Sequence, residues 1–448
     1  MTFTPPPSLG AFRFPLPYGT DAVRLTNASN APQGCHPRIY PYWSVINNHR
    51  GQSYLYVIIG RVGLKPLLLT VSTINGALLA QLELPIDGTA EGWYFSDTLP
   101  SSCYFLEGPQ LRRYDVFDGR TTTVFTLDPK HGHHLWQAHS SADDQTHSAT
   151  VKDANNQNVG AVVYRDGKQI FTPARGDFDE CQIDKSGRWL VIQENNENRI
   201  VDGGTGNEQS LTNAAGALSH IDCGDGYMVG ENDQGSMWAM DRRNLSDLTR
   251  RTLVTGEGAW GNGMGHCAVR PGVVLLSSNQ SQEILSLVTD VAYRPTPVAP
   301  GMIDGSDYDH QLRACLDPTG QYAAWIFSDA GRFDVCLVEL PGASAPPIIV
   351  HPDPGGSSMT PFPYFTSAEK AELAHDSGFT SVGVPGTFDG RDALIIPTVD
   401  TLPEGNGAWV TLTWANGKGV RQHGRLYLKQ EPDRATFAVD MTEEPTGF

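Results

Sequence analysis

The chain has 448 residues, and its 32 Lys and Arg against 50 Asp and Glu give a formal net charge of −18. This acidic balance argues against binding nucleic acid or an anionic membrane through bulk electrostatics. Charged residues make up only 18% of the chain, and the 47 Gly and 31 Pro are too many for a coiled coil. Together these values exclude a disordered chain and a long helical rod. No apolar run reaches the roughly 18 residues that a membrane-spanning helix needs.

At the N-terminus, Met1–Pro7 lacks the basic and apolar regions of a signal peptide. We expect residues 1–35 to form an N-terminal segment outside the main domain. The cysteines are odd in number and form no Cys-x-x-Cys pair, which predicts buried free thiols. They are Cys35, Cys103, Cys181, Cys223, Cys267, Cys315 and Cys336.

From residue 36 onward, short β-type runs rich in Val, Leu, Tyr and Trp alternate with turn dipeptides such as Asp118-Gly119. The first runs are Tyr54–Ile59, Leu67–Thr73 and Ala77–Leu84. Helical periodicity is nearly absent. Runs of this length with this punctuation predict an all-β chain.

The chain also contains an internal repeat. Asp184–Ile192 is similar to Asp317–Trp325, because each reads as a strand end, a tight Asp-x-Ser/Thr-Gly turn and a strand that opens with an aromatic residue. Anchored on this turn, the chain divides into seven units, near 36–90, 91–130, 131–175, 176–216, 217–260, 261–305 and 306–347. A ring of packed sheets buries faces that one four-stranded sheet cannot bury alone. We therefore predict a seven-bladed β-propeller over residues 36–350, with a large β-sandwich or two smaller β domains as the alternative.

The remaining residues are predicted to form a C-terminal β-rich extension. Residues 351–369 are rich in Pro and Gly and read as a linker. A short helix is expected at Ser367–Asp376, where a serine precedes Ala-Glu-Lys-Ala-Glu. Residues 370–448 are expected to form either a small β module or a tail that closes the propeller ring.

Six of the seven units begin near a histidine or an acidic residue, and the innermost strands of a propeller converge on one channel. Such a cluster is costly unless it binds a ligand, a proton or a metal. Three imidazoles on neighbouring units predict a divalent cation (Zn, Mn or Ca), with direct substrate contact as the alternative. They are His220, His266 and His310. Hydrogen bonds from histidines to backbone groups, tying blades together, would be a purely structural explanation.

Two further pairs are candidates for chemistry. Tyr227 and Arg243 begin and end neighbouring predicted strands, which would place them at one rim. The arginine would lower the tyrosine pKa and could hold a carboxylate. His134 and His147 flank a predicted hairpin and could act as acid and base or help to bind a metal. Trp136, between the first of them and the hairpin, offers a stacking platform for a sugar.

This combination of blade layout, His134, His147 and the Tyr227…Arg243 spacing resembles the β-propeller polysaccharide lyases over about residues 30–350. The similar families are the ulvan lyases and the rhamnosyl-glucuronate lyases and, more distantly, the oligogalacturonate lyases. The gap between the two histidines is shorter than the family pattern. The resemblance implies β-elimination at a uronic acid, with Arg243 neutralising the carboxylate and the tyrosine and histidines serving as base and acid.

The same resemblance implies an acidic polysaccharide or oligosaccharide as partner, no organic cofactor, a monomer, and an extracellular protein whose leader has been removed. A cytoplasmic protein remains the alternative. The predicted substrate contacts are Trp136, Gln137, His220, His310 and Gln311. Two other functions stay open: a glycoside hydrolase that uses the inward carboxylates of Glu180, Asp222 or Asp309, and a non-catalytic propeller that binds a glycan or a protein.

Overall fold

A computed structural model describes most of residues 6–340 and six strands between residues 372 and 443. Within the first range, the gaps are residues 7, 37–38, 51, 87–92, 233–238, 256–264, 279–280, 289–294, 304–310 and 330. The all-β prediction is confirmed, since the described residues form strands and one short 3-10 helix at Asn213–Ala215. No helix in this part of the chain is long and apolar enough to cross a membrane. All seven cysteines are buried and unpaired, as the sequence predicted.

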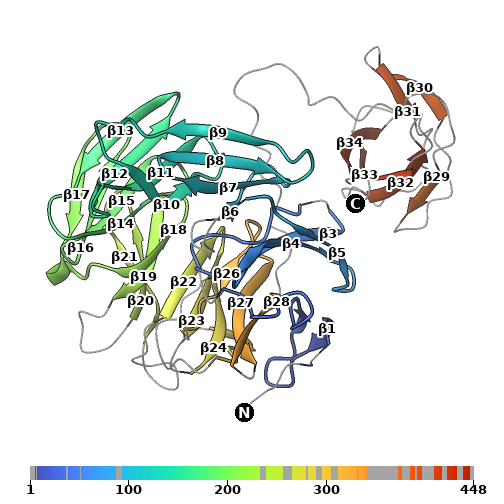
Figure 1. Cartoon of the computed structure of the whole chain (residues 1–448), viewed down its shortest axis with the longest axis horizontal. Coiled ribbons are helices and arrows are strands. Elements are labelled where there is room, and N and C mark those ends of the chain that lie inside the picture. The colour runs from blue at the N-terminus through green and yellow to red at the C-terminus, as the bar shows by residue number, and fades with distance from the viewer. Residues whose placement is uncertain are drawn as a thin grey trace. The chain divides into compact units, whose positions relative to one another are not determined.

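The propeller prediction is also confirmed: seven sheets follow one another in chain order, and the orange seventh blade lies beside the blue first blade (Figure 1). Blade 1 has a three-stranded sheet, and Ile46, which precedes these strands, forms an isolated β-bridge with Val57 in the first of them. The strands of this sheet are β3 (Tyr54–Arg61), β4 (Leu64–Ser72) and β5 (Leu78–Glu83). Blade 2 comprises β6 (Tyr94–Phe95), β7 (Ser102–Glu107), β8 (Gln110–Asp115) and β9 (Thr121–Thr126).

Blades 3 to 6 are four-stranded antiparallel sheets. Blade 3 comprises β10 (His134–Ser140), β11 (Thr146–Lys152), β12 (Asn158–Arg165) and β13 (Lys168–Pro173). Blade 4 comprises β14 (Phe178–Ile183), β15 (Trp189–Glu194), β16 (Glu197–Asp202) and β17 (Glu208–Leu211). Blade 5 comprises β18 (Ser219–Cys223), β19 (Tyr227–Asn232), β20 (Ala239–Asn244) and β21 (Arg250–Thr255). Blade 6 comprises β22 (Gly265–Arg270), β23 (Val273–Ser278), β24 (Glu283–Val288) and β25 (Thr296–Pro300).

Blade 7 is closed by the N-terminus of the chain. Its own strands are β26 (Cys315–Leu316), β27 (Tyr322–Asp329) and β28 (Arg332–Glu339), and β1 (Gly10–Arg13) and β2 (Asp21–Arg24) are added to the outer edge of β28. The predicted boundary at residue 35 therefore left two propeller strands outside the propeller. The physical reason is that β28 would otherwise present an unpaired outer edge, which β2 satisfies with backbone hydrogen bonds.

The first strands of successive blades contact one another, which places β10, β14, β18, β22 and β26 innermost, around the channel. Residues 348–448, with 51–53, form a second compact unit. Its sheet has the order β29 (Glu372–His375), β32 (Ala408–Ala415), β33 (Arg421–Gln430), β34 (Phe437–Glu443), and β30 (Val384–Phe388) pairs with β31 (Arg391–Ile395). The expected helix at Ser367–Asp376 is wrong at β29, because pairing with β32 outweighs local helix propensity there.

The repeated Asp-x-Ser/Thr-Gly turn links neighbouring blades. Asp184 and Asp317 are fully buried, and one carboxylate oxygen of each accepts two backbone N–H groups of its own turn. The other oxygen reaches the next blade: that of Asp184 accepts the Gly226 N–H at 2.9 Å, and that of Asp317 lies 3.0 Å from His49 Nε2. The self-similarity seen in the sequence is therefore a device that ties blades together.

The Asp317 carboxylate should make the free energy of unfolding depend on pH. Burial alone would raise its pKa, but hydrogen bonds from His49 and Thr319 outweigh burial and hold the pKa below its ordinary value. This stabilisation is present above the unfolded-state pKa of about 4 and is lost as pH falls through the lower folded-state pKa. Asp317→Asn should cost about 1.5–3 kcal/mol at pH 7. In urea unfolding, the difference from wild type should shrink below about pH 4. Asp225→Asn, in the exposed turn of blade 5, is the control, and an equal loss there would contradict this role.

Candidate functional site

The innermost strands of blades 3, 4 and 5 each contain a β-bulge in their first half. Register shifts insert one extra residue into β10, β14 and β18. The extra residues are Gln137, Asp179 and His220. Gln137 and His220 have φ values of 49° and 47°, which non-glycine residues rarely adopt. Bulges redirect side chains next to active sites, and strained backbone concentrates there, so this end of the channel is the candidate site.

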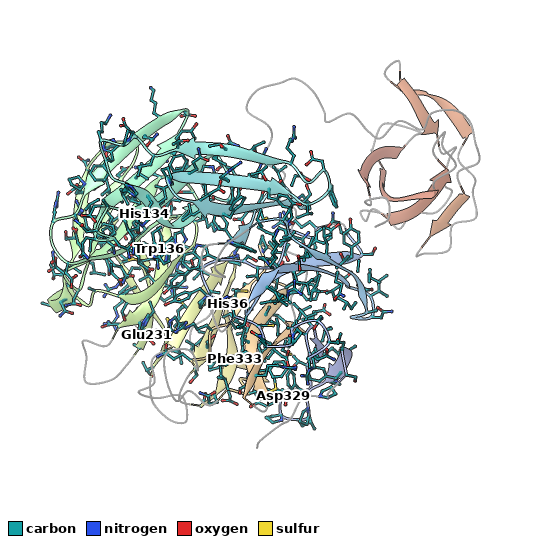
Figure 2. All side chains as sticks on the ribbon, in the orientation of Figure 1. His36, His134, Trp136, Glu231, Asp329 and Phe333 are labelled. Carbon is teal, nitrogen blue, oxygen red and sulfur yellow. The ribbon has the colours of Figure 1, made fainter. Side chains whose placement is uncertain are left out.

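His220 and His266, from blades 5 and 6, form the centre of the site. Their ring centroids are 4.5 Å apart. Glu231 is buried on β19 (Figure 2), and its carboxylate lies 3.1 Å from His220 Nδ1. The His220 side chain keeps 34% exposure, so it can meet a ligand from solvent. His266 is 1% exposed, and neither of its ring nitrogens has a hydrogen-bond partner among the described residues.

Burial, with the charges of His220 and Arg313, holds the pKa of His266 well below its ordinary value. His266 is therefore a neutral imidazole at pH 7. Arg313 precedes β26 in blade 7, and its guanidinium lies 4.8 Å over the Tyr40 ring. Tyr40 in turn meets the His266 ring edge-on at 5.6 Å. A cation, a phenol and two imidazoles thus gather at one mouth of the channel.

The segment of residues 40–43 crosses the channel. Its Tyr40 contacts blades 6 and 7, whereas Trp43 donates its indole N–H to the Ala138 carbonyl of blade 3 at 2.7 Å. Trp43 also stacks on His139, with centroids 5.2 Å apart. Between them, Tyr42 is buried. Sequence reasoning missed Tyr40 and Arg313, although the aromatic run Tyr-Pro-Tyr-Trp just before blade 1 was a signal for this segment.

Two buried carboxyl groups line the channel near Tyr42. Burial and the charge of Asp179 raise the pKa of Glu180 to about 8, and burial raises that of Asp222 to about 6. Glu180 is therefore protonated at neutral pH. The Tyr42 hydroxyl interacts electrostatically with both carboxyl groups. The same hydroxyl also interacts electrostatically with Tyr40, so the carboxyl pair and the Tyr40 end of the segment share one electrostatic environment.

The structure does not bring His134 and His147 together. His134 pairs in register with Lys152, and His147 pairs with Ser140, so the two histidines occupy opposite ends of the β10–β11 hairpin. Six strand residues correspond to about 20 Å. His147 is buried with Nδ1 2.7 Å from the Ser140 hydroxyl, and burial lowers its pKa to about 4. His134 lies at the rim and contacts Asn156 at 3.1 Å.

Tyr227 and Arg243 do not form the predicted pair either. Arg243 is opposite Met228, the neighbour of Tyr227 along β19, so strand alternation sends the two side chains to opposite faces of blade 5. Arg242 instead lies over the Tyr227 ring, 4.2 Å from its centroid. Arg243 donates to the backbone carbonyls of residues 215 and 216 at 3.0 and 3.2 Å. This arginine therefore holds the loop that enters blade 5.

Three other predicted site residues lie in blades 3 and 7. Trp136 and Gln137 belong to the bulged strand of blade 3, and Gln311 contacts Arg313 Nη2 at 3.2 Å in blade 7. His310 lies outside the described residues. No group of three or more metal-ligating side chains occurs among the described residues. The structure therefore assembles two of the three predicted metal ligands, His220 and His266.

Comparisons with known proteins agree with the fold. No family model and no curated protein sequence matches the chain. An oligogalacturonate lyase from Vibrio parahaemolyticus superimposes with a TM-score of 0.55 and 9% identity, covering 75% of this chain and 97% of the lyase. An oligogalacturonate lyase in complex with manganese gives a TM-score of 0.54 and 10% identity, with the same coverage. TolB from Acinetobacter baumannii gives a TM-score of 0.36, 12% identity, and 65% and 81% coverage. At these identities the likeness to the two lyases shows the propeller fold alone.

Proposed function

We propose that this chain is a carbon–oxygen lyase that cleaves a uronic-acid-containing glycan by β-elimination. The observation that carries the proposal is the convergence of His220, His266, Tyr40 and Arg313 at the bulged mouth of the channel. These side chains replace the predicted Tyr227, Arg243, His134 and His147 set, which the fold keeps apart. The propeller likeness to oligogalacturonate lyases is consistent with a lyase, and a rhamnosyl-glucuronate linkage remains one candidate substrate.

The first requirement of the chemistry is to neutralise the uronate carboxylate, because its negative charge opposes loss of the C5 proton. Arg313 supplies a cation with the planar fork that suits a carboxylate. It lies 3% exposed at the mouth, where low dielectric strengthens its effect on charge developing in the transition state. Tyr40 holds the guanidinium in place through the contact with its ring.

The second requirement is a base and an acid. His220 takes the C5 proton, and the electron pair of that bond forms the C4–C5 double bond while the C4–oxygen bond breaks. The Glu231 carboxylate beside Nδ1 favours the tautomer that leaves Nε2 as the proton acceptor, and it stabilises the imidazolium that results. We assign to Tyr40 the return of a proton to the leaving glycosidic oxygen, because its ring contacts both Arg313 and His266.

A divalent cation needs more ligands than the described residues supply. Catalytic zinc sites use three protein ligands, whereas His220 and His266 are two. His310, the third predicted ligand, lies outside the described residues. We therefore assign every step to the protein's own side chains, and a metal requirement is tested by chelation.

A glycoside hydrolase is the second candidate, because Glu180 and Asp222 are two channel carboxyl groups whose pKa values lie apart, as an acid and its partner require. Both are almost completely buried beside Tyr42, whereas His220 is accessible. Arg313 is as buried as these carboxyl groups, so it is the exposure of the proposed base, His220, that favours the lyase.

The proposal predicts new ultraviolet absorbance from C4–C5 unsaturated uronate ends when the full chain is incubated with ulvan, gum arabic or polygalacturonate. EDTA-dialysed protein should retain this activity if the side chains suffice, and recovery on adding Mn²⁺ after its loss would instead show a metal. New reducing ends without absorbance would favour the hydrolase. Neither signal on any polymer would contradict both enzymatic functions and favour a binding propeller.

A further inference from the structure

A tryptophan–lysine pair lies on blade 3, away from His220 and His266. The Lys152 ammonium sits 4.7 Å over the Trp136 ring. His134 and Trp136, both labelled in Figure 2, are two residues apart on β10, so strand alternation puts them on the same face. Both Trp136 and Lys152 are partly exposed. Neither the indole N–H nor the ammonium has a hydrogen-bond or ion-pair partner among the described residues, which is unusual for a cation in a chain of net charge −18.

This face of blade 3 is directed towards blade 4. Thr150, directly opposite Trp136 in register, has its hydroxyl 3.8 Å from Cys181 Sγ on β14. The Asn158 side-chain amide donates at 2.9 Å to the carbonyl of Asp179. Asp179 is the bulged residue whose carboxyl interacts electrostatically with His220. Trp136 and Lys152 of blade 3 therefore lie one blade away from Asp179, which interacts with His220 at the mouth of the channel.

The chain offers an internal comparison. Trp189 on β15 also carries a cation, since the Arg188 guanidinium lies 4.7 Å over its ring. Arg188, however, is neutralised by Asp202 through two contacts of 2.9 and 2.8 Å. The two aromatic–cation pairs thus share their geometry, and they differ in that Lys152 keeps an unmatched charge.

We propose that Trp136 and Lys152 form a second binding position, for an anionic sugar of the same glycan, beside the reaction mouth. The apolar face of the sugar packs on the indole, the indole N–H donates to a hydroxyl, and the ammonium binds the acidic group. The identity of the glycan rests on the proposed function, but the binding position itself does not depend on bond cleavage. It extends the substrate from His220 across blade 4 to blade 3.

Affinity electrophoresis of the full chain in gels containing ulvan, gum arabic or polygalacturonate tests this site directly. Trp136→Ala and Lys152→Met should each weaken retardation by about tenfold in the gel that retards wild type. Trp189→Ala and Arg188→Met, the matched controls, should migrate as wild type does. Raising the salt concentration should remove the difference between wild type and Lys152→Met, because the lost contact is ionic.

Three results would overturn the binding position: no retardation of wild type by any of the three polymers, equal retardation of wild type and both blade 3 variants, or equal retardation of wild type by the neutral polymer dextran. Thermal unfolding of each variant checks that the fold is kept. Retardation that depends on Trp136 and Lys152, without any unsaturated product, would support this site while contradicting the lyase. Unsaturated product together with unchanged retardation of both blade 3 variants would support the lyase and contradict this site.

Discussion

Replacing His220 with alanine should reduce kcat/KM for formation of unsaturated uronate ends by about 10²–10⁴-fold, the usual contribution of a positioned general base. The loss should fall mainly on kcat, since the imidazole acts on the C5 proton in the transition state rather than in substrate binding. Initial rates of ultraviolet absorbance, measured over a range of substrate concentrations, separate the two parameters. His220 is partly exposed, so its removal should leave the unfolding temperature nearly unchanged.

The control for this variant is His131→Ala. His131 stacks on Phe171 of the outermost strand β13 at 4.6 Å, away from the channel, and its loss should not change the rate. Tyr227→Phe and His134→Ala serve a different purpose, because they remove residues that the sequence pattern favoured. If either abolished product formation while His220→Ala remained active, the reaction centre at blades 5 to 7 would be wrong.

The fold could be predicted from local features of the sequence. The repeated turn around Asp184 and Asp317 located corresponding positions in two blades, and the alternation of short strands and turns located the others. The partner of the outer edge of blade 7 could not be found in this way. It is β2, more than 300 residues away in sequence, and its pairing with β28 depends on closure of the whole ring rather than on any local pattern.

The site was predicted in part. Positions at the start of inner strands identified His220 and His266, because in a propeller such residues converge whatever their spacing in sequence. The Tyr227–Arg243 pair failed for a physical reason: a shift of one residue in register moves a side chain to the other face of a sheet. The bulges at Gln137 and Asp179 were likewise invisible, since they depend on hydrogen-bond register. Tyr40 lies in the first predicted unit but before the strands of blade 1, and its contacts with blades 6 and 7 depend on closure of the ring.

Ring closure itself should depend strongly on Arg24, and Arg24→Ala should lower the free energy of unfolding by about 3–5 kcal/mol. This arginine, at the end of β2, is 2% exposed. Its Nη2 lies 2.7 Å from the fully buried Asp334 carboxylate and 2.8 Å from that of Asp329, both in blade 7. Removing the guanidinium leaves Asp334 with less compensation for its burial, and it detaches the N-terminal strands from β28.

Urea unfolding of the full chain measures the loss, and Arg13→Ala is the matched control in the same hairpin. Arg13 pairs with Asp21 at 3.2 Å, but both side chains are about two-thirds exposed, so the expected change is within about 0.5 kcal/mol. Hydrogen exchange provides a second readout if Arg24→Ala folds poorly. In Arg24→Lys, which keeps the charge but not the planar fork, amides of β2 and β28 should lose protection before those of blade 4. Equal protection in all blades, or an Arg24→Ala loss no larger than that of Arg13→Ala, would show that the ring is held by the other blade contacts and not by this buried ion pair.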